Sequence, residues 1–219
     1  LADVCTAYRK RAKNEQTGEP LAPATIKNRI RYLTAACRYA WKHAGMGESD
    51  PAAKVTVPTV RNERRVFLSR SEMLELARAS KDRGVRAMVR IAFYSGLRFG
   101  EIMRAEIVGT AFVLRDTKNG DPRIVPIHPK IRACQGIRPQ SRFTFDYHFA
   151  KARQAVGRPD LHFHDLRHSA ASAMLAAGVD LHTVGAVLGH RSTQSTRRYA
   201  HFVQGHLEDA IFRVGRKAA

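Results

Sequence analysis

Four residues near the end of this chain have side chains suited to covalent chemistry on a phosphate. His164 and Arg167 lie three residues apart in the segment HDLRH. His190 follows a Leu-Gly pair, and Tyr199 comes nine residues later, after two adjacent arginines. Arginine offers a planar set of donors that matches phosphate oxygens, and a tyrosine oxygen can hold a phosphoryl group covalently. This combination predicts cleavage of a phosphodiester by a tyrosine nucleophile.

Two further candidates lie upstream. Arg98 belongs to the turn-like sequence SGLRFGE, in which Glu101 follows three residues later. Lys118 precedes an Asn-Gly pair, and the flanking segments Ala111–Leu114 and Arg123–Ile127 have the apolar pattern of strands. Because Asn-Gly favours the tight turn of a hairpin, we expect Lys118 at or beside the tip of a β-hairpin.

The histidines also allow a different interpretation. His164 and His168 are four residues apart, a spacing that can chelate zinc on a helix. However, the chain has no HExxH motif, Asp165 is the only carboxylate close by, and Arg167 would repel a cation. We therefore expect no metal and no cofactor. Taken singly, Arg167 could instead form a salt bridge with Asp165, and His164 could be an ordinary half-buried histidine.

The composition indicates a polyanionic partner. The 219 residues include 38 Lys+Arg against 19 Asp+Glu, a formal net charge of +19. Self-repulsion of this excess opposes folding, so nucleic acid is the simplest partner. An inert basic surface, a ribosomal protein or a membrane-surface protein would have the same charge. Three scattered cysteines favour a reducing cytosol over a disulfide framework. No apolar run is long enough to span a membrane, and no signal peptide opens the chain.

The elements that must position these residues are mainly helical. Apolar residues at helical spacing, among them Ile26, Ile30 and Leu33, predict a helix over Thr25–Ala44. Its other face is basic and includes Lys27, Arg31, Arg38 and Lys42. Such a face is either only solvated or bound to a DNA backbone, which makes these four residues candidates for DNA binding.

A second set of local signals lies further along. Ser69 and Glu72 form a capping box that begins a helix, and Leu68 with Met73 is positioned for the hydrophobic staple around it. Further helices are predicted over residues 85–94, from residue 100, and from residue 146 onward. The result is a mainly helical α+β fold with a small β-sheet or hairpin. We expect a small helical domain over residues 1–57, a charged linker over 58–65, and a larger domain over 66–219.

Together, SGLRFGE, the lysine hairpin, HDLRH, LGH and RRYAH resemble, in this order, the tyrosine recombinases of the phage integrase family. The resemblance covers nearly the whole chain and implies a role for each candidate residue. By this resemblance, Arg98 and Arg167 clamp the scissile phosphate, and Glu101 supports Arg98. The resemblance also implies that His164 and His190 contact the phosphate. Lys118 would be the general acid toward the leaving 5′-oxygen, and Tyr199 the nucleophile.

The same resemblance implies the biology of the chain. Residues 1–57 would be a partial core-binding domain that clamps DNA, and residues 66–219 the catalytic domain. The activity would be site-specific cleavage and rejoining of double-stranded DNA through a 3′-phosphotyrosyl intermediate, carried out by a homotetramer on attachment sites with accessory DNA-bending proteins. The source would be a prophage or mobile element, and the location the bacterial cytoplasm, at the nucleoid.

Two alternatives and two structural questions stay open. A type IB topoisomerase uses similar chemistry on one duplex, and a non-catalytic DNA-binding protein could keep the same fold. The semi-apolar segment after Tyr199 could pack on its own domain or on a neighbouring subunit. Because the sequence begins with Leu1 and not with Met, we expect that an N-terminal portion is missing.

Overall fold

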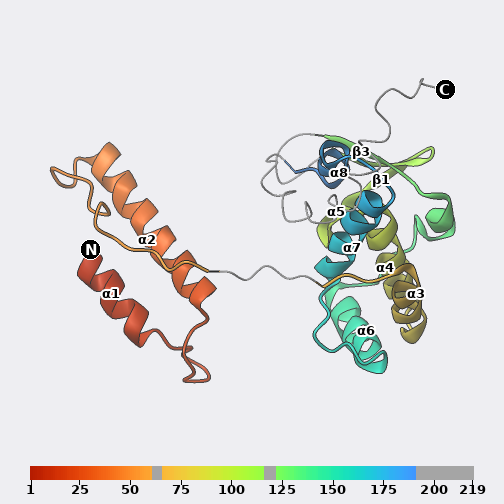
Figure 1. Cartoon of the computed structure of the whole chain (residues 1–219), viewed down its shortest axis with the longest axis horizontal. Coiled ribbons are helices and arrows are strands. Elements are labelled where there is room, and N and C mark those ends of the chain that lie inside the picture. Colours follow the sequence, from red (N-terminus) through yellow and green to blue (C-terminus); the bar gives the residue numbers. More distant parts are fainter. Residues whose placement is uncertain (61–65, 116–121, 191–219) are drawn as a thin grey trace, which may run out of the picture. The chain divides into compact units, whose positions relative to one another are not determined.

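The computed structural model of this chain describes residues 1–60, 66–115 and 122–190. The chain divides into two compact units, Leu1–Arg64 and Arg65–Ala219 (Figure 1). The first unit contains α1 (Ala2–Arg11) and α2 (Pro23–Ala44). The second contains α3 (Arg70–Ala79), α4 (Arg83–Ser95), α5 (Phe99–Arg104), β1 (Glu106–Val108), β2 (Ala111–Leu114), β3 (Arg123–Pro126), the 3-10 helix η1 (Pro129–Cys134), α6 (Arg142–Ala155), α7 (Phe163–Ala176) and α8 (Leu181–Leu188).

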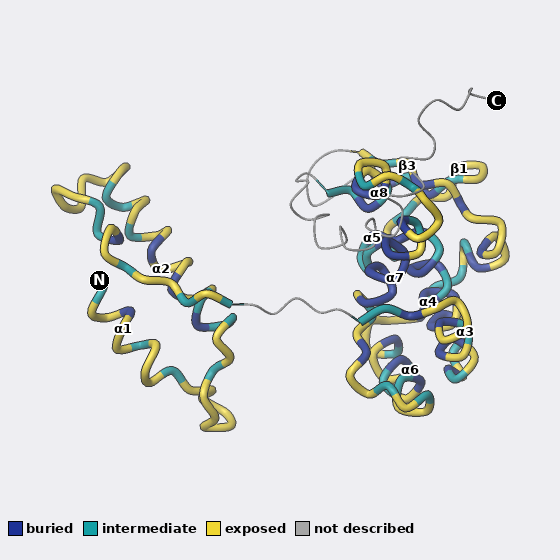
Figure 2. The backbone as a smooth tube through the Cα atoms, viewed as in Figure 1, coloured by how far each residue is buried: buried dark blue, intermediate teal, exposed yellow. Residues whose placement is uncertain are grey.

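The first unit buries little of its sequence. The predicted helix is present as α2, and its buried stripe of Ile26 and Ile30 packs with Cys5 of α1. Leu33 was expected on the buried face, but its side chain is 42 % exposed. That expectation was wrong because the buried stripe of α2 continues to Thr34, the next position along the same line of the helix. Figure 2 shows that exposed and intermediate positions dominate this unit.

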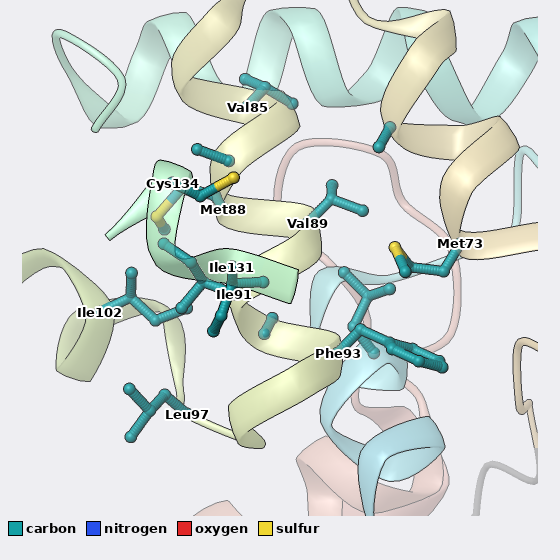
Figure 3. Packing of buried hydrophobic residues seen from close by; sticks show 14 of the residues in the cluster. Met73, Val85, Met88, Val89, Ile91, Phe93, Leu97, Ile102, Ile131 and Cys134 are labelled. Atoms are coloured by element: carbon teal, nitrogen blue, oxygen red, sulfur yellow. The ribbon is translucent and has the colours of Figure 1, made fainter. Parts of the chain in front are cut away.

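The second unit has a continuous apolar core organised around α4. This helix contacts α3, α5, α6, α7 and η1, and its side chains are buried around much of its circumference. Val85, Met88, Val89, Ile91 and Phe93 project into this core (Figure 3). A helix surrounded by packed neighbours is a rigid support, because its position is fixed from several sides at once.

The capping box predicted for α3 is confirmed. The Ser69 hydroxyl accepts a hydrogen bond from the Glu72 amide at 3.2 Å, and the Glu72 carboxylate accepts one from the Ser69 amide at 2.7 Å. Leu68 and Met73, the predicted staple, are both buried in the main core. Local sequence therefore fixes where α3 begins.

Within the described residues, the sheet has three antiparallel strands in the order β1-β2-β3. β2 and β3 pair in the register Val113 opposite Ile124 and Leu114 opposite Arg123, which confirms the predicted strand pair. β1 pairs with β2 and was not predicted. The connection between β2 and β3, residues 116–121, lies outside the described residues, so the position of Lys118 stays a prediction.

Three further helices, α6, α7 and α8, lie within the described part of the second unit. The helical segment expected from residue 146 begins earlier, at Arg142, because the Ser141 hydroxyl accepts a hydrogen bond from the Thr144 amide at 3.0 Å and caps the helix there. α7 packs against both α4 and α8. Over the residues that the structure describes, no helix is long and apolar enough to cross a membrane. The observed architecture confirms the mainly helical α+β prediction.

Candidate active site

The end of α4 brings Arg98 and Glu101 together. Gly96 ends the helix with φ of 67°, and a Cβ at this position would lie 2.5 Å from the Leu188 side chain, so glycine alone fits the turn. Arg98 then precedes α5, and Glu101 lies in its first turn. The Glu101 carboxylate accepts a hydrogen bond from the Arg98 amide at 2.8 Å and another from the Arg98 guanidinium at 2.7 Å. The Arg98 side chain is 38 % exposed, so the guanidinium is held in place yet accessible to a ligand.

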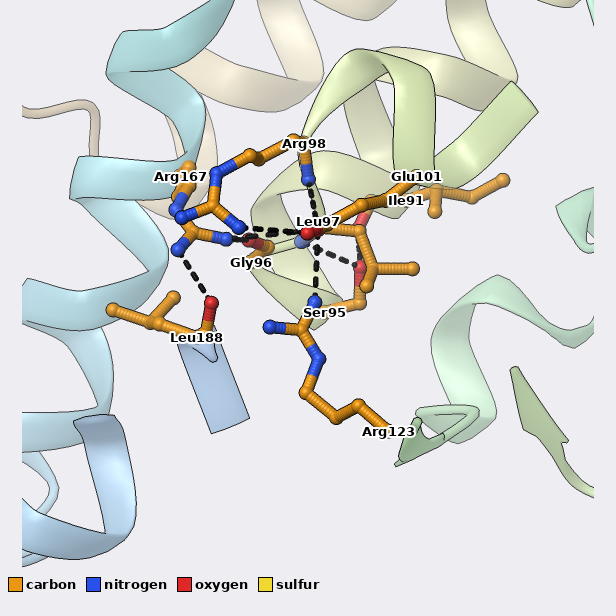
Figure 4. A network of polar contacts seen from close by, with 9 residues as sticks. All are labelled: Ile91, Ser95, Gly96, Leu97, Arg98, Glu101, Arg123, Arg167 and Leu188. Carbon is orange, nitrogen blue, oxygen red and sulfur yellow. Dashed lines mark hydrogen bonds and ion pairs between the residues drawn. The ribbon is translucent and has the colours of Figure 1, made fainter. Parts of the chain in front are cut away.

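Arg167 reaches the same site from α7. Its side chain is only 2 % exposed, and it donates to the carbonyl of Gly96 at 2.6 Å and to that of Leu188 at 2.5 Å. These carbonyls belong to the C-terminal ends of α4 and α8, where the helix dipole favours a cation. The Arg167 guanidinium also lies 3.8 Å from the Glu101 carboxylate. Arg98, Glu101 and Arg167, separated by up to 69 positions in the numbering, therefore form one cluster (Figure 4).

A third arginine, which the sequence analysis did not single out, completes this cluster. Arg123 begins β3, and its guanidinium donates to the Glu101 carboxylate at 2.8 Å. Its side chain is 12 % exposed. An arginine at the start of a strand looks like an ordinary solvated residue, and only its place directly after the lysine hairpin could have drawn attention to it. Figure 4 shows the guanidinium groups of Arg98, Arg123 and Arg167 arranged around Glu101.

The Glu101 carboxylate is ionised despite its burial. Burial acts to raise its pKa, but the hydrogen bond from the Arg98 amide and the charges of Arg123 and Arg98 outweigh it, so the pKa of Glu101 lies below its ordinary value. One carboxylate among three guanidinium groups leaves the cluster with a net charge of +2. A buried region with this charge is suited to an anionic ligand.

The two candidate histidines, His164 and His190, each lie at the end of a helix. His164 lies in the first turn of α7, where it is exposed, three residues before Arg167. His190 follows Gly189, whose φ of 65° ends α8, and its amide donates to the Gly185 carbonyl at 2.9 Å. The structure therefore confirms that His164 and Arg167 share one helix. It gives His190 a fixed backbone position at the end of α8.

His164 and His168, the two histidines at zinc-binding spacing, pack against each other. The rings of His164 and His168 meet edge to face, with their centroids 4.8 Å apart. His168 is buried, whereas His164 is exposed. Within residues 1–60, 66–115 and 122–190, no three His, Cys, Asp or Glu side chains are grouped so that they could hold a metal ion.

An open recess of about 600 Å³ borders the site between α6 and the first turns of α5 and α7. Aromatic side chains form its apolar wall, and Arg142 lies 4.3 Å from the centre of the Phe99 ring. Arg153, His162 and His164 supply polar groups. Asp146 also lines the recess and pairs with Arg142 at 2.8 Å, and Phe145 and Phe149 of the wall belong to the buried core.

Comparison with known proteins shows what this chain is similar to. The model of the phage integrase family matches residues 133–206, the segment that contains HDLRH, LGH and RRYAH. A shufflon-specific DNA recombinase of Escherichia coli is 31 % identical over 206 residues, which is 86 % of this chain and 53 % of that protein. A tyrosine recombinase XerD of Lacticaseibacillus casei is 27 % identical over 85 % of this chain and 75 % of its own length.

Residues 133–206 thus match the phage integrase family, and the chain is similar to tyrosine recombinases over most of its length. It spans about half the length of the shufflon recombinase, at 53 %, and larger shares of several other relatives. Its fold is also that of the family. A lambda integrase dimer bound to a core site matches all of this chain and 80 % of that chain, with a TM-score of 0.69 at 20 % identity. The catalytic domain of the integrase of bacteriophage HP1 matches 70 % of this chain with a TM-score of 0.51 at 24 % identity.

The structure describes part of the predicted site of this phage integrase homologue. It brings Arg98, Glu101 and Arg167 into direct contact and gives the backbone positions of His164 and His190. Lys118 and Tyr199 lie outside the described residues, as does the segment after Tyr199. Their predicted roles therefore stay predictions.

The candidate DNA-binding residues of α2 also stay predictions. Lys27 is partly buried, while Arg31, Arg38 and Lys42 are exposed. Arg38 is not available in the way the sequence suggested, because its guanidinium pairs with the Asp50 carboxylate at 3.0 Å. The pair is exposed, so DNA could compete for Arg38 at modest cost.

Proposed function

We propose that this chain is a site-specific DNA recombinase that cleaves and rejoins strands through a covalent 3′-phosphotyrosyl intermediate. The observation that carries the proposal is the buried carboxylate of Glu101 with Arg98 and Arg167 beside it, in a chain that matches the phage integrase family over residues 133–206. Two guanidinium groups held before substrate arrives are preorganised to stabilise charge that develops on a phosphate. Their charge does not depend on pH in the physiological range.

In the proposed reaction, one bond to phosphorus forms while another breaks. The Tyr199 oxygen loses its proton and attacks the scissile phosphorus, while the bond from phosphorus to the 5′-oxygen breaks. Lys118 gives a proton to that leaving oxygen. Arg98 and Arg167 hold the phosphate, and His164 and His190 also contact it. His164 assists the transfer of the proton from the attacking tyrosine. Attack by a 5′-hydroxyl on the phosphotyrosine reverses the steps, so rejoining needs no ATP.

The proposed substrate is double-stranded DNA that carries attachment or recombination sites. The net charge of +19 and the similarity to integrases solved on DNA support this choice. We propose a homotetramer on DNA, with accessory DNA-bending proteins where the sites are far apart. Similarity to phage integrases and to a shufflon recombinase supports a prophage or mobile element as the source and the bacterial cytoplasm, at the nucleoid, as the location.

The proposal also divides the chain by function. Residues 1–57 are proposed as part of a core-binding domain that clamps DNA, residues 58–65 as the linker, and residues 66–219 as the catalytic domain. The relatives reported above are named recombinases or integrases, which gives the type IB topoisomerase alternative no support. A non-catalytic DNA-binding role would leave the Arg98, Glu101 and Arg167 cluster without a purpose.

The test is to trap the covalent intermediate. The chain is incubated, in excess EDTA, with nicked suicide substrates made from candidate attachment sites, and the adduct is separated by denaturing electrophoresis. We expect an adduct that peptide mapping places on Tyr199, and none with Tyr199→Phe, which should still fold and bind DNA. An adduct on a different tyrosine, full activity of the Phe variant, or cleavage that EDTA abolishes and zinc restores would contradict the proposal.

A further inference from the structure

Arg123 connects two parts of the candidate active site. On one side its guanidinium donates to the Glu101 carboxylate at 2.8 Å. On the other side it lies against Gly189, where a Cβ would come within 1.8 Å of its Nη1 atom and 2.9 Å of its Cζ atom. Gly189 is the residue directly before His190. One side chain therefore touches both the acid that holds Arg98 and the backbone that carries His190.

We propose that Arg123 is a positioning residue for strand cleavage. It holds Glu101 so that Arg98 and Arg167 keep their orientation toward the scissile phosphate, and it fixes the end of α8 from which His190 extends. This inference rests on the proposed function, since it assigns Arg123 a part in the same reaction. It goes beyond the seven residues to which the resemblance assigns roles, and it gives Arg123 a role that acts through its neighbours.

The first argument is the charge of the cluster. Without Arg123, the single charge of Glu101 would cancel one of the two charges of Arg98 and Arg167, leaving +1. With Arg123 the cluster carries +2. A phosphodiester carries one negative charge, and the transition state of attack by a tyrosinate approaches two. The extra charge therefore favours the transition state over the bound substrate, which is the difference that accelerates a reaction.

The second argument is the cost of burying Arg123. Its Nε atom is buried and has no hydrogen-bond partner among the described residues. Burial lowers the pKa of its guanidinium, although the charge of Glu101 acts in the opposite direction. A buried donor without a partner destabilises the fold. The presence of an arginine at this costly position is better explained by its contacts with Glu101 and Gly189 than by a gain in stability.

The third argument is shape. The planar guanidinium of Arg123 presents one nitrogen to Glu101 while another lies against Gly189. Lysine could keep the charge near Glu101, but a single ammonium group cannot face both neighbours. Arg123→Lys should therefore restore only part of what Arg123→Gln loses.

The test separates chemistry from binding and from stability. Single-turnover rates of covalent adduct formation are measured on a suicide substrate at saturating DNA, together with the DNA dissociation constant. We expect Arg123→Gln to slow adduct formation about 100-fold, comparable to the loss of one preorganised donor, with little change in affinity. Arg123→Lys should recover about tenfold of this loss.

Arg138→Gln is the matched control. Arg138 is a half-buried arginine of the same unit whose guanidinium donates to the backbone carbonyls of Ile102 and Gln135. Its loss should lower stability and leave the rate of adduct formation within about threefold. If Arg138→Gln slows the rate as much as Arg123→Gln does, the effect is general destabilisation and the proposal is overturned.

A double-mutant cycle tests whether Arg123 acts through Glu101. If it does, Arg123→Gln in the background of Glu101→Gln should slow adduct formation far less than it does in the wild type. Rate losses that multiply as for independent sites would overturn the connection. The same would follow if Arg123→Gln reacted at the wild-type rate.

A readout without DNA separates this inference from the proposed function. The imidazole NMR signals of His190, assigned by comparison with His190→Gln, should shift in Arg123→Lys and stay in place in Arg138→Gln. If wild-type protein forms no adduct with any candidate site, the proposed function fails while this measurement still tests positioning. Unchanged His190 signals in Arg123→Lys would overturn the proposal.

Discussion

The second unit of the chain buries an ion pair, whereas the first unit keeps one at its surface. In the first unit, Arg38 and Asp50 form an ion pair at the surface, with side chains 48 % and 28 % exposed. In the second, Arg167 and Glu101 lie in the interior, with side chains 2 % and 8 % exposed. The second unit also has surface pairs, such as Arg142 with Asp146, but it fixes Arg167 and Glu101 in its interior.

The difference follows from the cores. Among the described residues, the apolar cluster of the first unit has three buried members, whereas the main cluster of the second has 24. Desolvating several charges is costly unless each is paired and the surrounding structure holds the pairs in place. Only the second unit has a core able to do so. A buried catalytic cluster therefore needs the unit with the large core, whereas a binding surface can be built on the unit with the small core.

The largest effect is expected from Arg167→Gln. The substitution leaves the carbonyls of Gly96 and Leu188 without their donor and Glu101 with one cation fewer, which should cost the second unit about 3–5 kcal/mol of stability and abolish adduct formation. Arg38→Gln, the surface counterpart, should cost the first unit less than about 1 kcal/mol.

Urea denaturation can follow the two units separately. The chain has one tryptophan, Trp41, which lies in α2, so its fluorescence reports on the first unit, while far-UV circular dichroism reports on the whole chain. Equal losses of stability in the two variants would contradict the expectation that the interior arginine contributes more than the surface arginine.

The next largest effect is expected from Lys118→Ala. If Lys118 protonates the leaving oxygen, its loss should slow cleavage by about 10²–10⁴ while affinity for DNA hardly changes. A substrate with a 5′-bridging phosphorothiolate, whose sulfur leaves without a proton, should restore most of the rate. The same substrate should not rescue Arg167→Gln. Without recovery on the sulfur substrate, Lys118 would be a contact to DNA, and another residue, such as His164, would be the acid.

A smaller, pH-dependent effect is expected from Glu101→Gln. Because the pKa of Glu101 is lower in the folded protein than its ordinary value, its ionised form stabilises the fold above that value, and the contribution is lost as the pH falls through the folded pKa. The free energy of unfolding of the wild type should therefore fall more steeply than that of Glu101→Gln as the pH drops below about 4.5. Equal slopes would show that Glu101 is not coupled to the arginines.

Asp50→Asn provides the surface counterpart for the pH series. The hydrogen bond from the Ala52 amide lowers the pKa of Asp50, and Arg38 adds to the effect. Asp50 is exposed to solvent, so its substitution should change the pH dependence of the first unit much less than Glu101→Gln changes that of the second. A larger change in Asp50→Asn would reverse the comparison.

Sequence predicted the parts of this molecule that depend on neighbouring residues. The capping box of Ser69 and Glu72 and the strand pair of β2 and β3 use signals within a few positions, and both are present. The contact of Arg98 with Glu101 was implied by the family resemblance, and it too joins residues only three positions apart. β1 was missed because it is three residues long and exposed throughout, so no apolar alternation marks it.

The long-range part of the site could not be predicted by spacing. Arg167 bonds to the Gly96 carbonyl, 71 positions away, and Arg123 bonds to Glu101, 22 positions away. No local pattern links such residues, since the contacts arise only when α7 and β3 pack around α4 and α5. The family resemblance supplied Arg167 but not Arg123, which only the structure brought to the site.

The smallest effect is expected on the salt dependence of DNA binding. The basic face of α2 should contact phosphates, so the logarithm of affinity should fall with the logarithm of salt concentration by about 0.9 for each phosphate neutralised. Charge reversal of Lys27, Arg31 and Lys42 should make this slope shallower and leave the rate of adduct formation at saturating DNA unchanged. Arg38→Glu should change the slope less, because Arg38 must first give up its pair with Asp50. A slope that none of these changes alters would show that the basic face of α2 is only solvated. The first unit would then have no role in binding DNA through this face.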